Sequence, residues 1–193
     1  LRSIFPEAYS NLGNALKEKG DLESAILSYK KAIQLNSIFA EAHWNLSLVQ
    51  LLTGDYDSGW DSYQWRTKKK DPKLPHCKPQ INEWDGGELE KNEKLLIISE
   101  QGLGDTIQYM RYIPYLRSLH IDLSFCTLTK LHTLIQSSKI DKSPLSPEQA
   151  EKVKKGKWIS LLSLPRLLRI TPSNPIVLEP YISSTSEFKK NWR

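Results

Sequence analysis

The chain has little cysteine and a single methionine. Its two cysteines, Cys77 and Cys126, lie in separate regions and lack the spacing of a metal site. A disulfide-rich scaffold and a cysteine-based metal centre are therefore excluded, and we expect two free thiols in a reducing cytoplasm. The only methionine is Met110 and the first residue is Leu1, so we expect a fragment of a longer product, with neither Leu1 nor Arg193 established as a true terminus.

Long apolar runs are also missing. No stretch approaches the roughly 20 apolar residues that a membrane-spanning helix needs. The opening residues, LRSIFPEAYSN, lack the apolar centre of a signal peptide. We therefore expect no transmembrane segment and a cytoplasmic location. The composition, 39% hydrophobic and 25% charged, is typical of a soluble globular protein.

Charge is only moderately unbalanced. The net charge is +5, and its densest part runs from Arg66 to Lys78. This stretch fits a solvated basic connector, or a surface that attracts an anionic sugar phosphate or lipid headgroup. No stripe of aromatic residues accompanies the lysines, so we predict no nucleic-acid partner.

What the chain does contain is an internal repeat. Its period is that of tetratricopeptide repeats, each of which is a hairpin of two helices. We predict an N-terminal domain over residues 1–66, with repeats at about 6–39 and 40–68. Gly20 and Gly54 are expected to end a helix in the left-handed conformation, and Asp21 and Asp55 to cap the next one. The matched pairs are Asn11-Leu12 with Asn45-Leu46, Gly20-Asp21 with Gly54-Asp55, and Ser28-Tyr29 with Ser62-Tyr63.

Two such repeats are fewer than the three usually needed for a stable array. We therefore expect further repeats upstream, packing against the following domain, or both. Trp60 and Trp65 bring large apolar area to the second, more degenerate repeat, which fits a terminal repeat that packs against another part of the protein.

The segment resembles the tetratricopeptide family, and that resemblance implies a concave groove that binds extended peptides. Asn11 and Asn45 occupy matching positions on the first helix of each hairpin. They are similar to the asparagine ladder in the repeats of protein O-linked N-acetylglucosamine transferases, where amides grip a peptide backbone. The resemblance implies a protein or peptide partner. An ordinary polar position on an exposed helix is the equally open alternative.

A connector over residues 67–93 and a second domain over 94–193 are expected next. KLLIIS (94–99) is a continuous aliphatic run, typical of a strand buried on both faces. We predict a helix from about Thr106 to Leu119, and a helix start at Ser146 and Pro147. The alternation of strands and helices favours a parallel sheet, so the predicted fold class is α + α/β, helical hairpins followed by a Rossmann-like half-domain. The other predicted segments are strands in IDLSFC (121–126) and WISLLSL (158–164) and helices in LTKLHTLIQ (128–136) and PRLLRI (165–170).

The loop EQGLGD follows the first predicted strand, where parallel sheets place their ligands. Gly102 and Gly104 would let backbone N–H groups face a ligand. The spacing is neither a dinucleotide fingerprint nor a P-loop. Asp105 has two interpretations: it caps the following helix, or it takes a proton from an acceptor hydroxyl as a general base. A capping carboxylate has a lowered pKa and is a poorer base.

The stretch KLLIISEQGLGDTIQYMRYIPYL, together with the later LLSLP at 161–165, resembles a bacterial glycosyltransferase-like domain that follows tetratricopeptide repeats. It is more distantly similar to the first half of ADP-heptose:lipopolysaccharide heptosyltransferases. The resemblance implies that Gly104 and Asp105 lie on the acceptor side of a cleft, with Asp105 as candidate base. The other residues it implies for the cleft are Glu100, Gln101, Gly102, Gln108 and Arg111.

Proteins of that kind hold the nucleotide-sugar donor mainly in a second Rossmann-like half, which this sequence does not contain. We therefore expect no cofactor or metal in this chain, a donor only with the second half, and no catalysis by the chain alone. The alternative is a non-catalytic protein–protein interaction module. The sequence does not identify the sugar, the acceptor, the number of upstream repeats or the oligomeric state.

Overall fold

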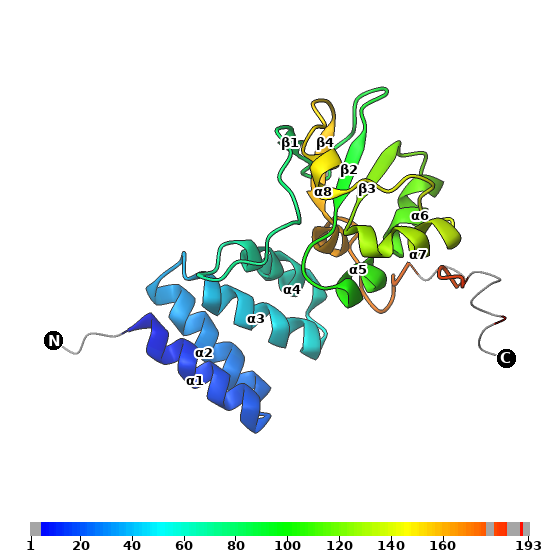
Figure 1. The fold of residues 1–193 in the computed structure, drawn as a ribbon. Helices are drawn as coiled ribbons and strands as arrows, with labels where there is room; N and C mark the ends of the chain where they lie inside the picture. The colour runs from blue at the N-terminus through cyan, green and yellow to red at the C-terminus, as the bar shows by residue number, and fades with distance from the viewer. Residues whose placement is uncertain (1–4, 177–179, 185–189, 191–193) are drawn as a thin grey trace. The chain divides into compact units, whose positions relative to one another are not determined.

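The computed structural model describes residues 5–176, 180–184 and 190. The chain divides into two compact units (Figure 1), which we describe separately. The first comprises Leu1–Lys73 with Arg169–Thr171, and the second comprises Leu74–Leu168 with Pro172–Arg193. Helical hairpins form the first unit and a small parallel sheet with helices forms the second, so the predicted α + α/β class is confirmed.

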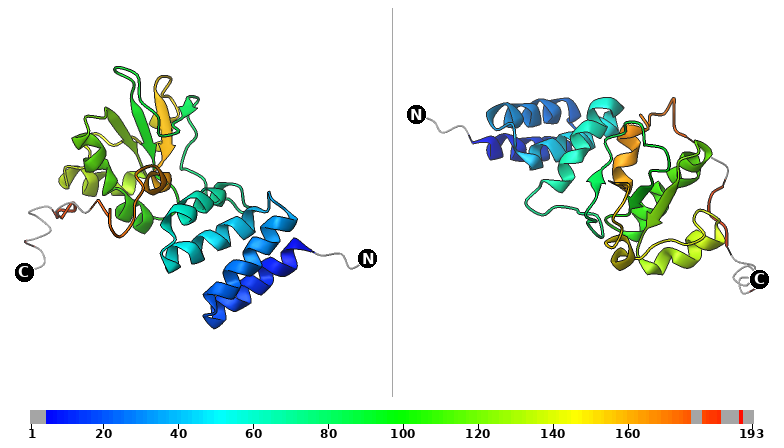
Figure 2. Two further views of the ribbon diagram at one scale, coloured as in Figure 1. Left: turned by 180° about the vertical axis from the view of Figure 1, so that it is seen from behind. Right: turned by 90° about the horizontal axis from the view of Figure 1, so that it is seen from above.

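The first unit consists of two helical hairpins, seen from two further sides in Figure 2. Helices α1 and α3 are equally long and begin and end at matching positions of the two repeats, so the predicted repeat is confirmed at the level of helix bounds. The second helix of the second hairpin, α4, is shorter than its counterpart α2, because the chain continues from it as a 3-10 turn. The elements are α1 (Pro6–Lys19), α2 (Leu22–Leu35), α3 (Ala40–Thr53), α4 (Tyr56–Tyr63) and the 3-10 turn η1 (Gln64–Thr67).

The turns inside both hairpins have the predicted chemistry. Gly20 and Gly54 end their helices with φ of 87° and 90°, in the left-handed region that favours glycine. Asp21 and Asp55 then cap the second helix of each hairpin. Each carboxylate accepts the backbone N–H three residues further on, at 3.1 and 3.2 Å.

The hairpin helices approach closely where the sequence places glycine. A Cβ added to Gly13 would lie 2.6–2.9 Å from three carbons of the Tyr29 ring. That ring is fully buried and packs in a cluster with Ala25 of α2 and with Leu46 and Val49 of α3. The contact therefore ties the first hairpin together and joins it to the second.

The described part of the second unit is built on a sheet of four parallel strands. All four residues of the strand β2 are buried, as the continuous aliphatic run predicts. The predicted parallel sheet is confirmed, with the spatial order β1-β4-β2-β3. The strands are β1 (Asn82–Glu83), β2 (Leu95–Ile98), β3 (Leu123–Cys126) and β4 (Lys157–Ser160).

The helices of this unit are shorter than the sequence suggests. The prediction of a single helix from Thr106 to Leu119 is wrong, because two helices occupy this segment and meet near Met110. Pro114 explains the break, because it has no N–H for the carbonyl four residues earlier, that of Met110. The capping of the helix at Ser146 is confirmed. The elements are α5 (Leu103–Tyr109), α6 (Tyr112–Ser118), η2 (Thr129–Leu131), α7 (His132–Ser137), α8 (Pro147–Ala150), η3 (Leu161–Ser163) and α9 (Leu164–Leu167).

Two further segments differ from the sequence-based expectation. The strand predicted in WISLLSL ends at Ser160, and the next residues form the 3-10 turn η3. Residues 82–83, inside the expected connector, form the edge strand β1 beside β4. The Trp84 N–H donates to the Trp158 carbonyl at 2.7 Å, which extends that pairing. So short a strand carries no alternating pattern, and the sequence therefore contains no signal for it.

Replacing Gly13 by alanine tests the close approach of the helices. The new methyl group would overlap the Tyr29 ring, so we expect a destabilisation of about 1–3 kcal/mol in urea unfolding followed by circular dichroism. Gly104→Ala is the control, because nothing lies within 4 Å of the added carbon and the site is helical. Equal losses in the two variants would contradict the packing argument.

Candidate functional site

The predicted loop joins the carboxyl end of β2 to helix α5. Gln101 adopts a φ of 61°, and Gly102 precedes the first helical residue. The expectation that Asp105 is itself the N-cap is corrected, because Asp105 is the third residue of α5. Its Oδ2 accepts the Gly102 N–H at 3.2 Å, so the carboxylate holds the start of the helix from inside. Asp105 is half-buried, so solvent still reaches it.

Two of the predicted cleft residues contact each other at the end of the same helix. The Arg111 Nε donates to the Gln108 carbonyl at 2.7 Å, and the guanidinium carbon lies 5.5 Å from the centre of the Tyr181 ring. Tyr181 in turn donates its hydroxyl to the Ile107 carbonyl at 3.0 Å. Arg111 therefore packs on the segment 180–184 of the second unit.

Glu100 does not line an open surface: its side chain is fully buried. Ser160, at the end of β4, donates its hydroxyl to Glu100 Oε1. Because β2 and β4 are parallel neighbours, their carboxyl ends meet and bring these two residues together. Sequence reasoning found no partner for Glu100, since the contact joins residues 60 positions apart.

His76 completes the polar group at this edge of the sheet, and sequence reasoning missed it because it lies in the expected connector. Its Nε2 is 3.2 Å from the Gln101 carbonyl and its Nδ1 is 2.8 Å from the Ser99 hydroxyl. A carbonyl only accepts, so Nε2 carries the proton and Nδ1 accepts from Ser99 in the neutral imidazole. His76 thereby holds the backbone of the loop at Gln101.

Two buried polar atoms near this group have no hydrogen-bond partner among the described residues. They are Thr127 Oγ1, directly after β3, and Gln101 Nε2 in the loop. Ser99 follows β2 and Ser160 ends β4, so three adjacent strands carry a hydroxyl at their carboxyl ends. Such an edge is where parallel sheets bind ligands, and hydroxyl and amide groups suit a polar, hydroxyl-rich molecule.

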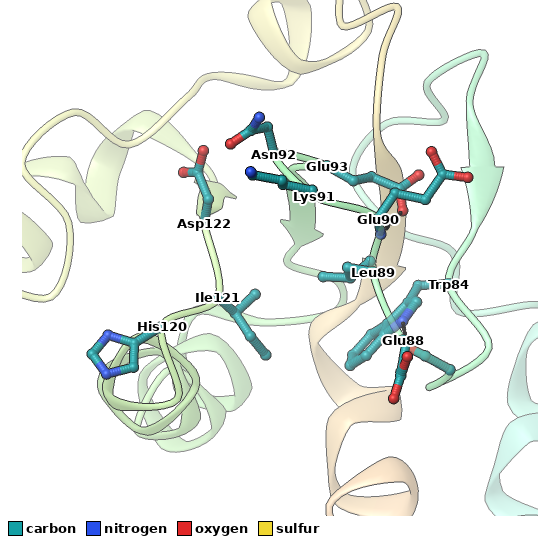
Figure 3. A pocket seen from close by; sticks show the side chains of 11 residues that line it. Trp84, Glu88, Leu89, Glu90, Lys91, Asn92, Glu93, His120, Ile121 and Asp122 are labelled. Atoms are coloured by element: carbon teal, nitrogen blue, oxygen red, sulfur yellow. Dashed lines mark hydrogen bonds between the residues drawn. The ribbon is translucent and has the colours of Figure 1, made fainter.

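The structure also has a hollow of about 520 Å³ at the amino ends of the strands, formed by the segments that precede β2 and β3 (Figure 3). Residues 120–122 form one side, and Trp84 with 87–93 forms the other. Four carboxylates and one lysine line it, and Glu93 is already engaged, because its Oε2 accepts the Glu90 N–H at 3.0 Å. Sequence reasoning placed a cleft at the carboxyl ends of the strands and did not predict this hollow. The charged lining residues are Glu88, Glu90, Glu93, Asp122 and Lys91.

The two predicted groove asparagines take equivalent places on the first helices of the two hairpins. Asn11 on α1 is exposed and Asn45 on α3 is half-buried. Leu48 and Leu52 follow Asn45 at one and two turns along α3, with 37% and 70% of their surface exposed. The face that carries Asn45 therefore combines an amide with exposed leucines.

Aromatic rings do accompany the basic stretch after α4, which corrects the sequence-based expectation. His43 of α3 stacks on Trp65 with ring centres 4.0 Å apart, and the Lys68 ammonium lies 4.5 Å from the Trp65 ring centre. Lys69 lies 5.0 Å from the ring of Trp44. Helix packing brings residues 43–44 beside 65–69, so the sequence alone did not show the cluster. These contacts cover the last turns of the second repeat.

The Trp60 indole N–H also has a partner inside the first unit, the Ile170 carbonyl at 2.8 Å. Trp60 therefore contacts a segment outside the repeats, as expected for the tryptophans of the second repeat, whereas Trp65 stacks on His43 within that repeat. Among the described residues, no group of three His, Cys, Asp or Glu is placed to hold a metal ion. In that same part of the chain, no helix has both the length and the apolar character to cross a membrane.

The cysteines are free thiols, as predicted, but they are close in space. Their Sγ atoms lie 3.8 Å apart in a buried cluster that includes Leu96, Ile98 and Trp158. Burial raises the pKa of both thiols, most strongly that of Cys126. The neutral thiol is therefore the form that the folded state holds.

These raised pKa values predict a loss of stability at alkaline pH. Above the unfolded thiol pKa of roughly 8.5, the unfolded chain releases thiol protons that the folded chain retains. The free energy of unfolding should then fall by up to about 1.4 kcal/mol per pH unit for Cys126. Urea unfolding between pH 8 and pH 10 measures the slope, and Cys126→Ala should flatten it. The same slope in both proteins would contradict the assignment.

Comparisons with known proteins identify the repeat of the first unit. Residues 13–54 match the TPR repeat family, and this match covers α2, α3 and part of α1. Protein FlbA of Caulobacter vibrioides is 26% identical over 117 residues, which is 59% of this chain and 20% of FlbA. The chain thus spans about a fifth of the length of that relative. Residues 13–54 are therefore a TPR repeat.

Proposed function

We propose that the helical repeats of this chain bind a polypeptide. The observation that carries the proposal is the equivalent placement of Asn11 and Asn45 on helices α1 and α3, one repeat apart. A side-chain amide donates and accepts hydrogen bonds, so it suits a peptide backbone whose side chains vary. TPR repeats generally mediate protein interactions, which supports this function for residues 13–54.

The exposed leucines beside Asn45 add apolar contact to the proposed surface. Leu52 exposes 70% of its surface and Leu48 exposes 37%, and both lie on the same stripe of α3 as Asn45. Because apolar side chains of a ligand gain about 25 cal/mol per Å² buried, these leucines favour a ligand with apolar residues near its amide contacts.

Peptides selected from a random display library against the whole chain provide the test. Asn45→Ala should weaken the selected peptides by roughly 2- to 10-fold, the usual value of one hydrogen bond, and Asn11→Ala by a similar factor. Leu27→Ala is the matched control, because that leucine is 68% exposed on α2 rather than on a first helix. Unchanged affinity in both asparagine variants, or equal loss in the control, would contradict the proposal.

A second candidate function is sugar transfer, with the second unit as the acceptor side of a glycosyltransferase-like fold. The observation that favours it is the edge where Ser99, Thr127 and Ser160 follow or end adjacent strands, with the half-buried Asp105 in the first turn of the helix after β2. In this proposal Asp105 takes the proton of an acceptor hydroxyl, and a nucleotide sugar is held by a donor half. Without such a half, the chain acts as a non-catalytic interaction module.

Asp105→Asn in the complete gene product separates these functions. The asparagine oxygen can still accept the Gly102 N–H, so helix α5 should keep its start. We expect transfer from radiolabelled nucleotide sugars to fall by about 100-fold or more, as for the loss of a general base, with peptide binding unchanged. Full transfer activity in Asp105→Asn would exclude Asp105 as the base.

A further inference from the structure

A lysine-rich segment follows the 3-10 turn η1 in the first unit. Residues 68–73 read KKKDPK, and we call them the lysine segment; Asp71 carries the one negative charge among them. Among the described residues, none of the four ammonium groups takes part in an ion pair. The segment therefore presents net positive charge to solvent. Lys68, Lys70 and Lys73 are exposed, and Lys69 is half-buried.

Two contacts hold the lysine segment against the first turns of α3. The Lys70 backbone N–H donates to Glu41 Oε1 at 2.8 Å. The Lys69 ammonium lies over the Trp44 ring, 5.0 Å from its centre. The segment is therefore fixed at the amino-terminal end of α3 by contacts with the helix itself.

The same side of α3 carries the surface that we propose for peptide binding. Residues spaced by three or four positions lie on one side of a helix, so Glu41 and Trp44 share a side with Asn45, Leu48 and Leu52. We call these five residues the α3 face. The lysine segment contacts its first two members and therefore borders the face at one end.

The distance from Asn45 to this border is short. An α-helix rises about 1.5 Å per residue, so Asn45 lies about 7–8 Å along the axis from Ala40, the first residue of α3. An extended peptide covers that distance in about two or three residues. A peptide whose backbone contacts Asn45 would therefore bring its next side chains within reach of the lysine segment.

We infer that the polypeptide bound by the repeats carries a cluster of acidic side chains, and that the lysine segment holds this cluster beside the α3 face. The inference rests on the peptide-binding function proposed above and adds the charge of the partner. Each exposed ion pair contributes about 1.5- to 5-fold in affinity. Complementary charge also speeds association and excludes basic peptides.

The aromatic rings beside the lysines favour a peptide over a nucleic acid or a membrane. Proteins that bind single-stranded nucleic acid stack bases on free ring faces. Trp65 offers no such face, because His43 stacks on it with ring centres 4.0 Å apart and Lys68 lies 4.5 Å from its centre. Trp44 is half-buried with Lys69 over its ring, so neither tryptophan is placed to enter a lipid headgroup layer. An ammonium held over a ring still has N–H donors for a carboxylate.

Peptides selected from a random display library against the whole chain are the probe, with affinity measured by fluorescence anisotropy. We expect Asp and Glu to be enriched at neighbouring positions of the selected peptides. Replacing these acids by Asn and Gln should weaken binding by roughly 5- to 30-fold at about 0.1 M salt, as for two or three exposed ion pairs. At about 1 M salt, where charges are screened, the difference should fall below about 2-fold.

Charge reversal in the chain distinguishes a charge contact from a loss of structure. Lys68→Glu/Lys69→Glu should weaken the acidic peptides by about 5-fold or more. A peptide whose acids are replaced by lysine should bind this variant at least about 5-fold more tightly than it binds the parent, a gain that an unfolded variant would not give. The matched control is Lys30→Glu/Lys31→Glu, which changes the charge equally at exposed positions of α2 and should alter both affinities by less than about 2-fold.

The outcomes separate this inference from the function on which it rests. If no peptide is selected, or if Asn45→Ala binds the selected peptides as the parent does, the proposed function fails and the inference fails with it. If Asn45→Ala weakens binding but the peptides carry no excess of acids, or the control reversal is equally damaging, only the inference fails. Phosphatidylserine vesicles or an oligothymidylate strand that bind more tightly than the peptides, and lose affinity with Lys68→Glu/Lys69→Glu, would assign the lysine segment to that partner instead.

Discussion

The repeat unit depends on the burial of one aromatic ring against a glycine. Tyr29 is fully buried, its ring lies over Gly13, and its hydroxyl donates to Asn14 Oδ1 at 2.8 Å. Burial raises the pKa of Tyr29 to about 12, so the phenol stays neutral and keeps its donor. Because the same ring packs in one buried cluster with Leu46 and Val49 of α3, one side chain holds the first hairpin closed and helps to stack the second on it.

The second unit solves a different problem, the burial of polar groups at the end of an apolar sheet. Strand β2 is buried along its whole length, so the chain that leaves it carries Ser99 and Glu100 into a buried position. Each must find a partner there, and His76 and Ser160 supply them. These contacts fix the backbone of the loop before α5 and thereby determine where Asp105 lies.

The two edges of this sheet offer different chemistry. The carboxyl edge presents buried hydroxyls and a constrained loop, whereas the amino edge has a hollow lined mainly by carboxylates. Besides these hydroxyls, the carboxyl edge carries two carboxylates, the buried Glu100 and the half-buried Asp105. The carboxylate-lined hollow would repel an anionic group such as phosphate.

Local patterns in the sequence determined the helical hairpins, their turns and the buried strand β2, because each depends on residues close along the chain. Gly20 and Asp21 specify a turn by themselves, and LLII specifies a buried strand. Only the tertiary structure decided the partners of Glu100, the role of His76, the approach of the two cysteines and the exposure of Leu12. Those features join residues far apart in sequence, and no local periodicity records which distant side chain a buried polar group or an apolar face meets.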